Sequence, residues 1–89
     1  MIEKNLQVKN KLGLHARPAA LFVQTTNKFK SKIRVIKDDQ EVNGKSIMGV
    51  MMLAANKGSS IQLETSGEDE IEAMTALIAL VEDCFGESE

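Results

Sequence analysis

The stretch GLHARPAA, from Gly13 to Ala20, marks the point at which the chain changes from strand to helix. Pro18 fixes its own φ at about −65° and has no N–H to lose, so it is favoured in the first turn of a helix. We therefore place the start of a helix at His15 to Arg17. The following apolar and small residues have the spacing of an amphipathic helix over 18–28: Ala19, Phe22, Val23 and Thr26.

The segments on both sides of this helix predict a sheet. Residues 2–8 place their apolar side chains at one parity, which is typical of a half-buried strand. Residues 32–37 and 61–65 alternate in the same way. A very short strand is predicted around Glu41, between the turn sequences DDQ and VNGK.

Two further helices are predicted. One begins at Ser46, runs for about two and a half turns and stops at Gly58. The last opens near Glu68 to Glu70, where acidic side chains suit a helix N-terminus. Its expected buried stripe is Ile71, Met74, Ile78, Val81 and Phe85. The order strand, helix, strand, strand, helix, strand, helix predicts an α+β fold with an antiparallel sheet and helices packed on one face.

Composition limits the classes of protein that fit. The 89 residues form one domain over 1–89, and 43% apolar with 27% charged residues is ordinary for a soluble protein. The net charge of −2 argues against nucleic-acid binding. No apolar run approaches membrane-spanning length, so we expect a cytoplasmic protein without membrane insertion. Cys84 is the single cysteine, which excludes an internal disulfide, and we expect it to be a small core residue near the end of the last helix.

The residues around His15 point to anion chemistry. The first N–H groups of a helix have no intrahelical partner, and with the helix dipole they favour a bound anion, here around Ala16 and Pro18. Imidazole is a nucleophile that is largely neutral at cytosolic pH. Arg17 supplies a guanidinium fork suited to phosphate. His15 is therefore a candidate phosphoryl acceptor. The structural alternative is a helix-start histidine beside a solvated arginine.

GLHARPAA, followed by GKSIMGVMML from Gly44, resembles the histidine-containing phosphocarrier (HPr) family of the bacterial sugar phosphotransferase system, and the resemblance spans the whole chain. It implies an open-faced β-sandwich, a four-stranded antiparallel sheet covered by three helices in the order βαββαβα. It also implies that enzyme I phosphorylates His15 on Nδ1 and that sugar-specific enzyme IIA domains receive the group. Arg17 matches the family's active-site arginine. The protein would be a carrier without metal or organic cofactor, not an enzyme.

Ser46 has two interpretations. It precedes an apolar helix, so its side chain is a candidate N-cap. The resemblance implies a regulatory phosphorylation site for a serine kinase/phosphorylase, with a transcriptional regulator as a further partner. A phosphate at a helix N-terminus is electrostatically tolerated, so the same residue can serve both roles.

The segment that follows Ser46 is too apolar for one face of a short helix. If Val50, Leu53 and Ala54 face inward, the methionines face outward. Exposed apolar patches mark interaction sites, and methionine adapts to several partners; a sheet that wraps further round the helix is the alternative. The resemblance favours a patch that docks enzyme I and its acceptors, and the expected docking residues are Ala20, Gln24, Ile47, Met48 and Met51.

Other functions stay open from the sequence. A carrier in a nitrogen-related or purely regulatory phosphorelay would use the same His15 chemistry with other partners. An enzyme would use His15 as a general base, although no second acid or base lies near it in sequence. In a passive anion-binding or interaction module, His15→Ala would matter no more than Arg17→Ala. We expect a monomer, and the sequence names neither the sugar nor the acceptors.

Overall fold

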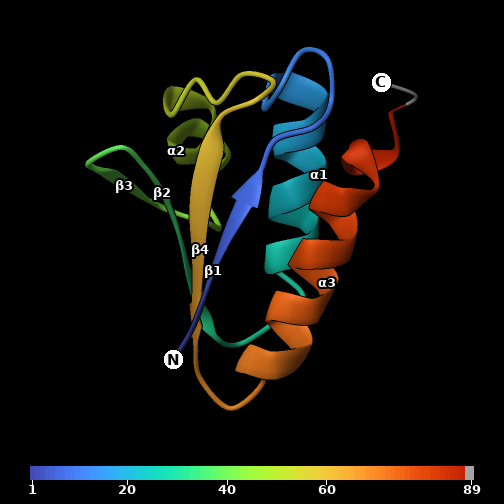
Figure 1. The fold of residues 1–89 in the computed structure, drawn as a ribbon. Coiled ribbons are helices and arrows are strands. Elements are labelled where there is room, and N and C mark those ends of the chain that lie inside the picture. The colour runs from blue at the N-terminus through green and yellow to red at the C-terminus, as the bar shows by residue number, and fades with distance from the viewer. Residues whose placement is uncertain (88–89) are drawn as a thin grey trace.

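The computed structural model describes residues 1–87. Its elements are β1 (Ile2–Gln7), α1 (Ala16–Thr26), β2 (Lys32–Lys37), β3 (Gln40–Asn43), α2 (Ile47–Met52), β4 (Ser60–Ser66), α3 (Glu70–Glu82) and a 3₁₀ turn, η1 (Cys84–Gly86). The four strands form one antiparallel sheet in the order β1-β4-β2-β3, and the three helices cover it (Figure 1). The predicted fold class is confirmed.

The core lies between the central strands and the two long helices. β2 and β4 alternate as predicted. Their inward-facing side chains are Ile33 and Val35 of β2 and Ile61 and Leu63 of β4, each at most 2% exposed. β1 is an edge strand, so its apolar residues are only half-buried. The helices contribute Ala19, Phe22, Ala73, Leu77 and Val81. Burying one large aliphatic side chain stabilises a fold by about 1.5–3 kcal/mol, so this set holds the helices to the sheet.

α1 follows the predicted stripe. Ala19, Phe22 and Thr26 are buried, and Pro18 is the third residue of the helix, in its first turn. Thr26 Oγ1 donates a hydrogen bond to the Gly44 carbonyl oxygen at 2.8 Å, which ties the end of α1 to the segment before α2. The helix ends at Thr26, two residues earlier than predicted, because Asn27 closes it.

α2 is shorter than predicted. It ends at Met52, and Ala54 adopts φ +49°, a left-handed conformation that cannot continue a helix. The prediction that Ala54 faces inward is wrong, since the buried residues are Val50, Leu53 and Ala55. After the turn at Ala54, the Ala55 carbonyl accepts a hydrogen bond from the Leu14 N–H in the loop before α1. α2 itself packs beside α1.

Two predictions for the C-terminal segment need correction. Ile71 is 65% exposed, because α3 is apolar on most of its surface and packs on β1 and β4 through Ala73 and Leu77 instead. Cys84 is only half-buried: it belongs to the turn after α3, and its neighbour Phe85 enters the core.

Candidate functional site

His15 is the N-cap of α1. Its backbone is extended, at φ −76° and ψ −171°, and its carbonyl oxygen accepts a hydrogen bond from the Ala19 N–H at 2.9 Å. The side chain makes no capping bond, and it is 36% exposed. The imidazole is therefore anchored through its backbone and open to a partner, as the phosphoryl-acceptor hypothesis requires.

The loop before His15 is held by its own hydrogen bonds. The Gly13 N–H donates to the Asn10 carbonyl at 3.1 Å, and Asn10 Nδ2 donates back to the Gly13 carbonyl at 2.7 Å. Leu14 is buried and donates from its N–H to the Ala55 carbonyl at 2.9 Å. His15 thus projects from a braced loop rather than a free one.

The first turn of α1 places the other predicted anion-site residues beside His15. Ala16, Arg17 and Pro18 are its first three residues; the first two are exposed and Pro18 is buried. Because proline has no N–H, the donors of this turn are the backbone N–H groups of Ala16 and Arg17. These N–H groups lie at the positive end of the helix dipole, and Arg17 belongs to the same turn.

Glu87 also belongs to this site, and sequence reasoning missed it. Its Oε2 lies 3.1 Å from His15 Nε2, and its Oε1 accepts a hydrogen bond from Asn10 Nδ2 at 2.8 Å. The Asn10 bond lowers the pKa of Glu87, helped by the bond and charge of His15 and by the charge of Arg17, against partial burial. No sequence pattern indicated this contact, because 72 positions separate Glu87 from His15.

Ser46 is the N-cap of α2, as predicted. Its Oγ accepts a hydrogen bond from the Gly49 N–H at 3.1 Å, and its carbonyl accepts one from the Val50 N–H at 3.0 Å. The side chain is partly exposed. The capping role is therefore confirmed, and the regulatory role stays a prediction.

An apolar patch covers the outer face of α2. Ile47, Met48, Met51 and Met52 are exposed, Met48 by 67%, and we call these four residues the α2 patch. The helix did not sink further into the sheet, so that alternative is wrong. Figure 1 places α2 at the same end of the molecule as the loop before α1. The predicted docking residues of α1 are half-buried Ala20 and exposed Gln24.

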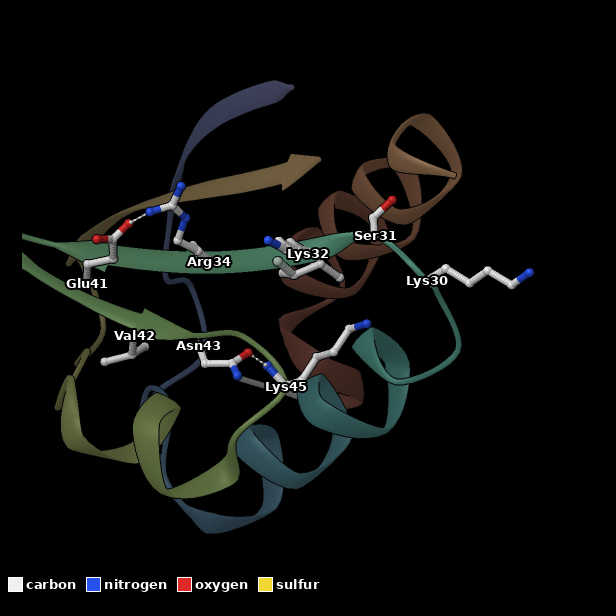
Figure 2. Close-up of a pocket in the computed structure, with 9 residues that line it drawn as sticks. Lys30, Ser31, Lys32, Arg34, Glu41, Val42, Asn43 and Lys45 are labelled. Carbon is white, nitrogen blue, oxygen red and sulfur yellow. Dashed lines mark hydrogen bonds and ion pairs between the residues drawn. The ribbon is translucent and has the colours of Figure 1, made fainter. Parts of the chain in front are cut away.

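A separate hollow of about 640 Å³ opens over β2 and β3 (Figure 2). It is lined by Lys30, Ser31, Lys32, Ile33, Arg34, Glu41, Val42, Asn43 and Lys45. Two of its cationic side chains have partners in the protein. Arg34 pairs with Glu41, and Lys45 Nζ donates a hydrogen bond to the Phe29 carbonyl at 2.7 Å. His15 is not among the lining residues, so this hollow is separate from the candidate site.

Within residues 1–87, no three or more His, Cys, Asp or Glu side chains are grouped so that they could hold a metal ion. In that same part of the chain, no helix has the length and apolar character needed to cross a membrane.

The chain is similar to known proteins of one family. A family model described as the PTS HPr component phosphorylation site matches residues 2–83. The chain is 56% identical to the phosphocarrier protein HPr of Neisseria meningitidis serogroup A over 89 residues, 100% of both chains. It is 60% identical over 82 residues to the HPr-like protein Crh of Halalkalibacterium halodurans, covering 92% of this chain and 98% of Crh.

Solved structures match as well. An HPr crystal structure from Thermoanaerobacter tengcongensis has a TM-score of 0.96 and 54% identity, with 100% of both chains covered. An HPr dimer from the same bacterium has a TM-score of 0.79 and 55% identity, covering 98% of this chain and 100% of that one.

Proposed function

This chain belongs to the HPr family of phosphocarrier proteins of the phosphotransferase system, and on that premise we propose that His15 is the residue that carries the phosphoryl group. Proteins of this family are carriers and not enzymes. The observation that carries the proposal is the 36% exposed imidazole of His15 at the N-terminus of α1, next to Arg17.

The chemistry follows from this geometry. The Nδ1 lone pair of a neutral imidazole attacks phosphorus in line with the departing donor atom. The phosphoryl oxygens then lie toward the first turn of α1, where Arg17 and the backbone N–H groups of Ala16 and Arg17 balance their charge. Pro18 starts the helix and keeps this turn in place. The site needs no cofactor for this step.

The donor in this proposal is phosphorylated enzyme I, and the acceptors are sugar-specific enzyme IIA domains. A carrier must present one histidine to unlike proteins, which favours an exposed, adaptable surface over a pocket. The α2 patch supplies Ile47, Met48 and Met51, and α1 supplies Ala20 and Gln24. We place the exchange in the cytoplasm, with the carrier as a monomer.

Ser46 is the proposed regulatory site. A serine kinase/phosphorylase would modify its Oγ, which now caps α2, and a transcriptional regulator would read the modified surface. Phosphate at a helix N-terminus is compatible with the dipole, so the domain would stay folded. The added charge would lie next to Ile47 at the margin of the α2 patch and would oppose docking of acidic partners.

The test is intact mass at alkaline pH after incubation with phosphoenolpyruvate and a bacterial enzyme I. We expect wild type to gain one acid-labile phosphate and His15→Ala to gain none. Arg17→Ala, which keeps the nucleophile, should be phosphorylated more slowly. If several enzyme I preparations leave wild type unmodified, the carrier function is wrong, and an anion-binding or interaction module becomes the better assignment.

A further inference from the structure

Glu87 holds the side of the His15 ring that faces away from the nucleophilic nitrogen. Its Oε2 lies 3.1 Å from Nε2 of His15, while Oε1 is fixed by Asn10 Nδ2 at 2.8 Å. The Glu87 side chain is 21% exposed, so solvent competes little for this carboxylate. The contact joins the segment after η1 to the start of α1, 72 positions apart in the sequence, and Figure 1 shows these two segments at the same end of the molecule.

Asn10 fixes the orientation of that carboxylate. Asn10 is fully buried, and its Nδ2 donates to both the Gly13 carbonyl and Glu87 Oε1. The reverse amide orientation would set its oxygen against two acceptors, so Asn10 can only donate here. Its Oδ1 has no hydrogen-bond partner within residues 1–87. A buried amide oxygen without a partner is unfavourable. The fold tolerates it here because the amide nitrogen of the same side chain donates both to the loop before His15 and to Glu87.

The turn after α3 delivers Glu87 to this position. Cys84, Phe85 and Gly86 have φ values of +54°, +55° and +77°, and together they reverse the chain. Left-handed conformations are disfavoured for residues with a Cβ, so the surrounding structure must hold this turn. Phe85 is 3% exposed and anchors it in the core, and the turn packs on α1.

The contact selects one form of the histidine. The pKa of Glu87 is lowered, chiefly by the Asn10 bond, so its carboxylate is ionised at neutral pH and can only accept. The hydrogen at Nε2 must then belong to His15. A neutral imidazole that carries its proton on Nε2 leaves the lone pair of Nδ1 bare.

We infer that Glu87 is a positioning residue for phosphoryl transfer, which holds His15 as the Nε2–H tautomer with Nδ1 directed outward. The inference rests on the proposed function of His15. During transfer the Nδ1 lone pair forms the N–P bond, and the bond from phosphorus to the donor atom breaks with its electron pair leaving on the donor. The proton stays on Nε2, so the ring becomes a cation, which the Glu87 carboxylate balances.

Glu87→Gln tests this role, with Glu82→Gln as the matched control. Both substitutions remove one carboxylate near the end of the chain, but Glu82 pairs with Lys9 and does not contact His15. We expect Glu87→Gln to slow phosphorylation by enzyme I about tenfold or more, by analogy with loss of the orienting carboxylate in a catalytic triad. The carrier concentration that gives half-maximal rate should not change, because docking is untouched. Glu82→Gln should match wild type.

Nitrogen-15 NMR of the His15 ring supplies a second readout that needs no enzyme. The neutral wild-type ring should show the Nε2–H tautomer, and Glu87→Gln should show a mixture. If wild type is phosphorylated and Glu87→Gln reacts at the same rate, the inference is wrong while the carrier function stands. A faster reaction would mean that the carboxylate opposes the incoming phosphoryl group. If wild type is never phosphorylated, the proposed function fails, whatever the tautomer.

Discussion

Gly13 lies against the backbone of Ala55 so closely that a Cβ at Gly13 would come within 2.1 Å of the Ala55 carbonyl oxygen. The same carbonyl accepts the Leu14 N–H at 2.9 Å, one residue before His15. Gly13 also has φ +68°, in the left-handed region. The loop that presents the histidine is therefore built on a backbone contact that only glycine permits.

Gly13→Ala should destabilise the protein by about 3 kcal/mol or more, because the left-handed backbone and the overlap with Ala55 add together. Gly58→Ala is the matched control. Gly58 has φ +89° but open space around its missing Cβ, so its substitution should cost only about 1–2 kcal/mol. Urea unfolding measures both variants. Equal losses would show that the Ala55 contact does not matter.

Ser46→Ala should cost about 1 kcal/mol, because the Gly49 N–H loses its acceptor at the start of a six-residue helix. Ser46→Asp keeps an oxygen at that position and should stay near wild-type stability. Ser60→Ala removes an exposed hydroxyl that caps no helix and should change stability by less than about 0.5 kcal/mol. Urea midpoints measure these differences. If Ser46→Ala unfolds at the same urea concentration as wild type, the capping bond is not a stabilising contact.

The α2 patch and α3 provide a matched pair of exposed apolar residues. Met48 is 67% exposed and Ile71 is 65% exposed, so a lysine at either position should leave the fold intact. Met48→Lys should lower the rate of phosphorylation by enzyme I about tenfold, as loss of a buried interface anchor costs more than about 1 kcal/mol. Ile71→Lys should leave that rate unchanged. Similar rates for the two variants would remove the α2 patch from the docking surface.

Asp69 should make stability fall at acid pH. Its carboxylate accepts hydrogen bonds from Ser31 Oγ and from the N–H groups of Lys30 and Ser31. These bonds, that from Ser31 Oγ foremost, lower the pKa of Asp69 below 3.8, so its contribution is present above that value and is lost as the pH falls through the lower, folded-state pKa. Between about pH 6 and about pH 3, wild type should lose more stability than Asp69→Asn.

The control for this experiment is Asp39→Asn. Asp39 is exposed in the turn between β2 and β3, so the substitution changes the same charge away from the Ser31 bonds. Its urea midpoints should follow those of wild type from neutral to acid pH. If Asp69→Asn follows them too, the bonds to Ser31 and Lys30 do not link this carboxylate to folding.

Several helices and strands could be predicted from the sequence by local patterns. Pro18 predicted the start of α1, and alternation in residues 32–37 and 61–65 predicted the central strands, because these signals act within a few residues. The stripe on α3 could not be read in the same way. When most of a helix surface is apolar, only the packed sheet selects the buried face, and it selected Leu77 while leaving Ile71 outside.

The residues of the candidate site also fall into two groups, those that a local pattern predicted and those that it did not. Short motifs at helix starts contain His15, Arg17 and Ser46. The first turn of a helix has unpaired N–H groups that favour an anion or a capping side chain, so these positions could be predicted from neighbouring residues alone. Glu87 and the Gly13–Ala55 contact arise between segments far apart in the chain. Such contacts depend on how the helices and loops pack on the sheet, and no local pattern encodes that packing.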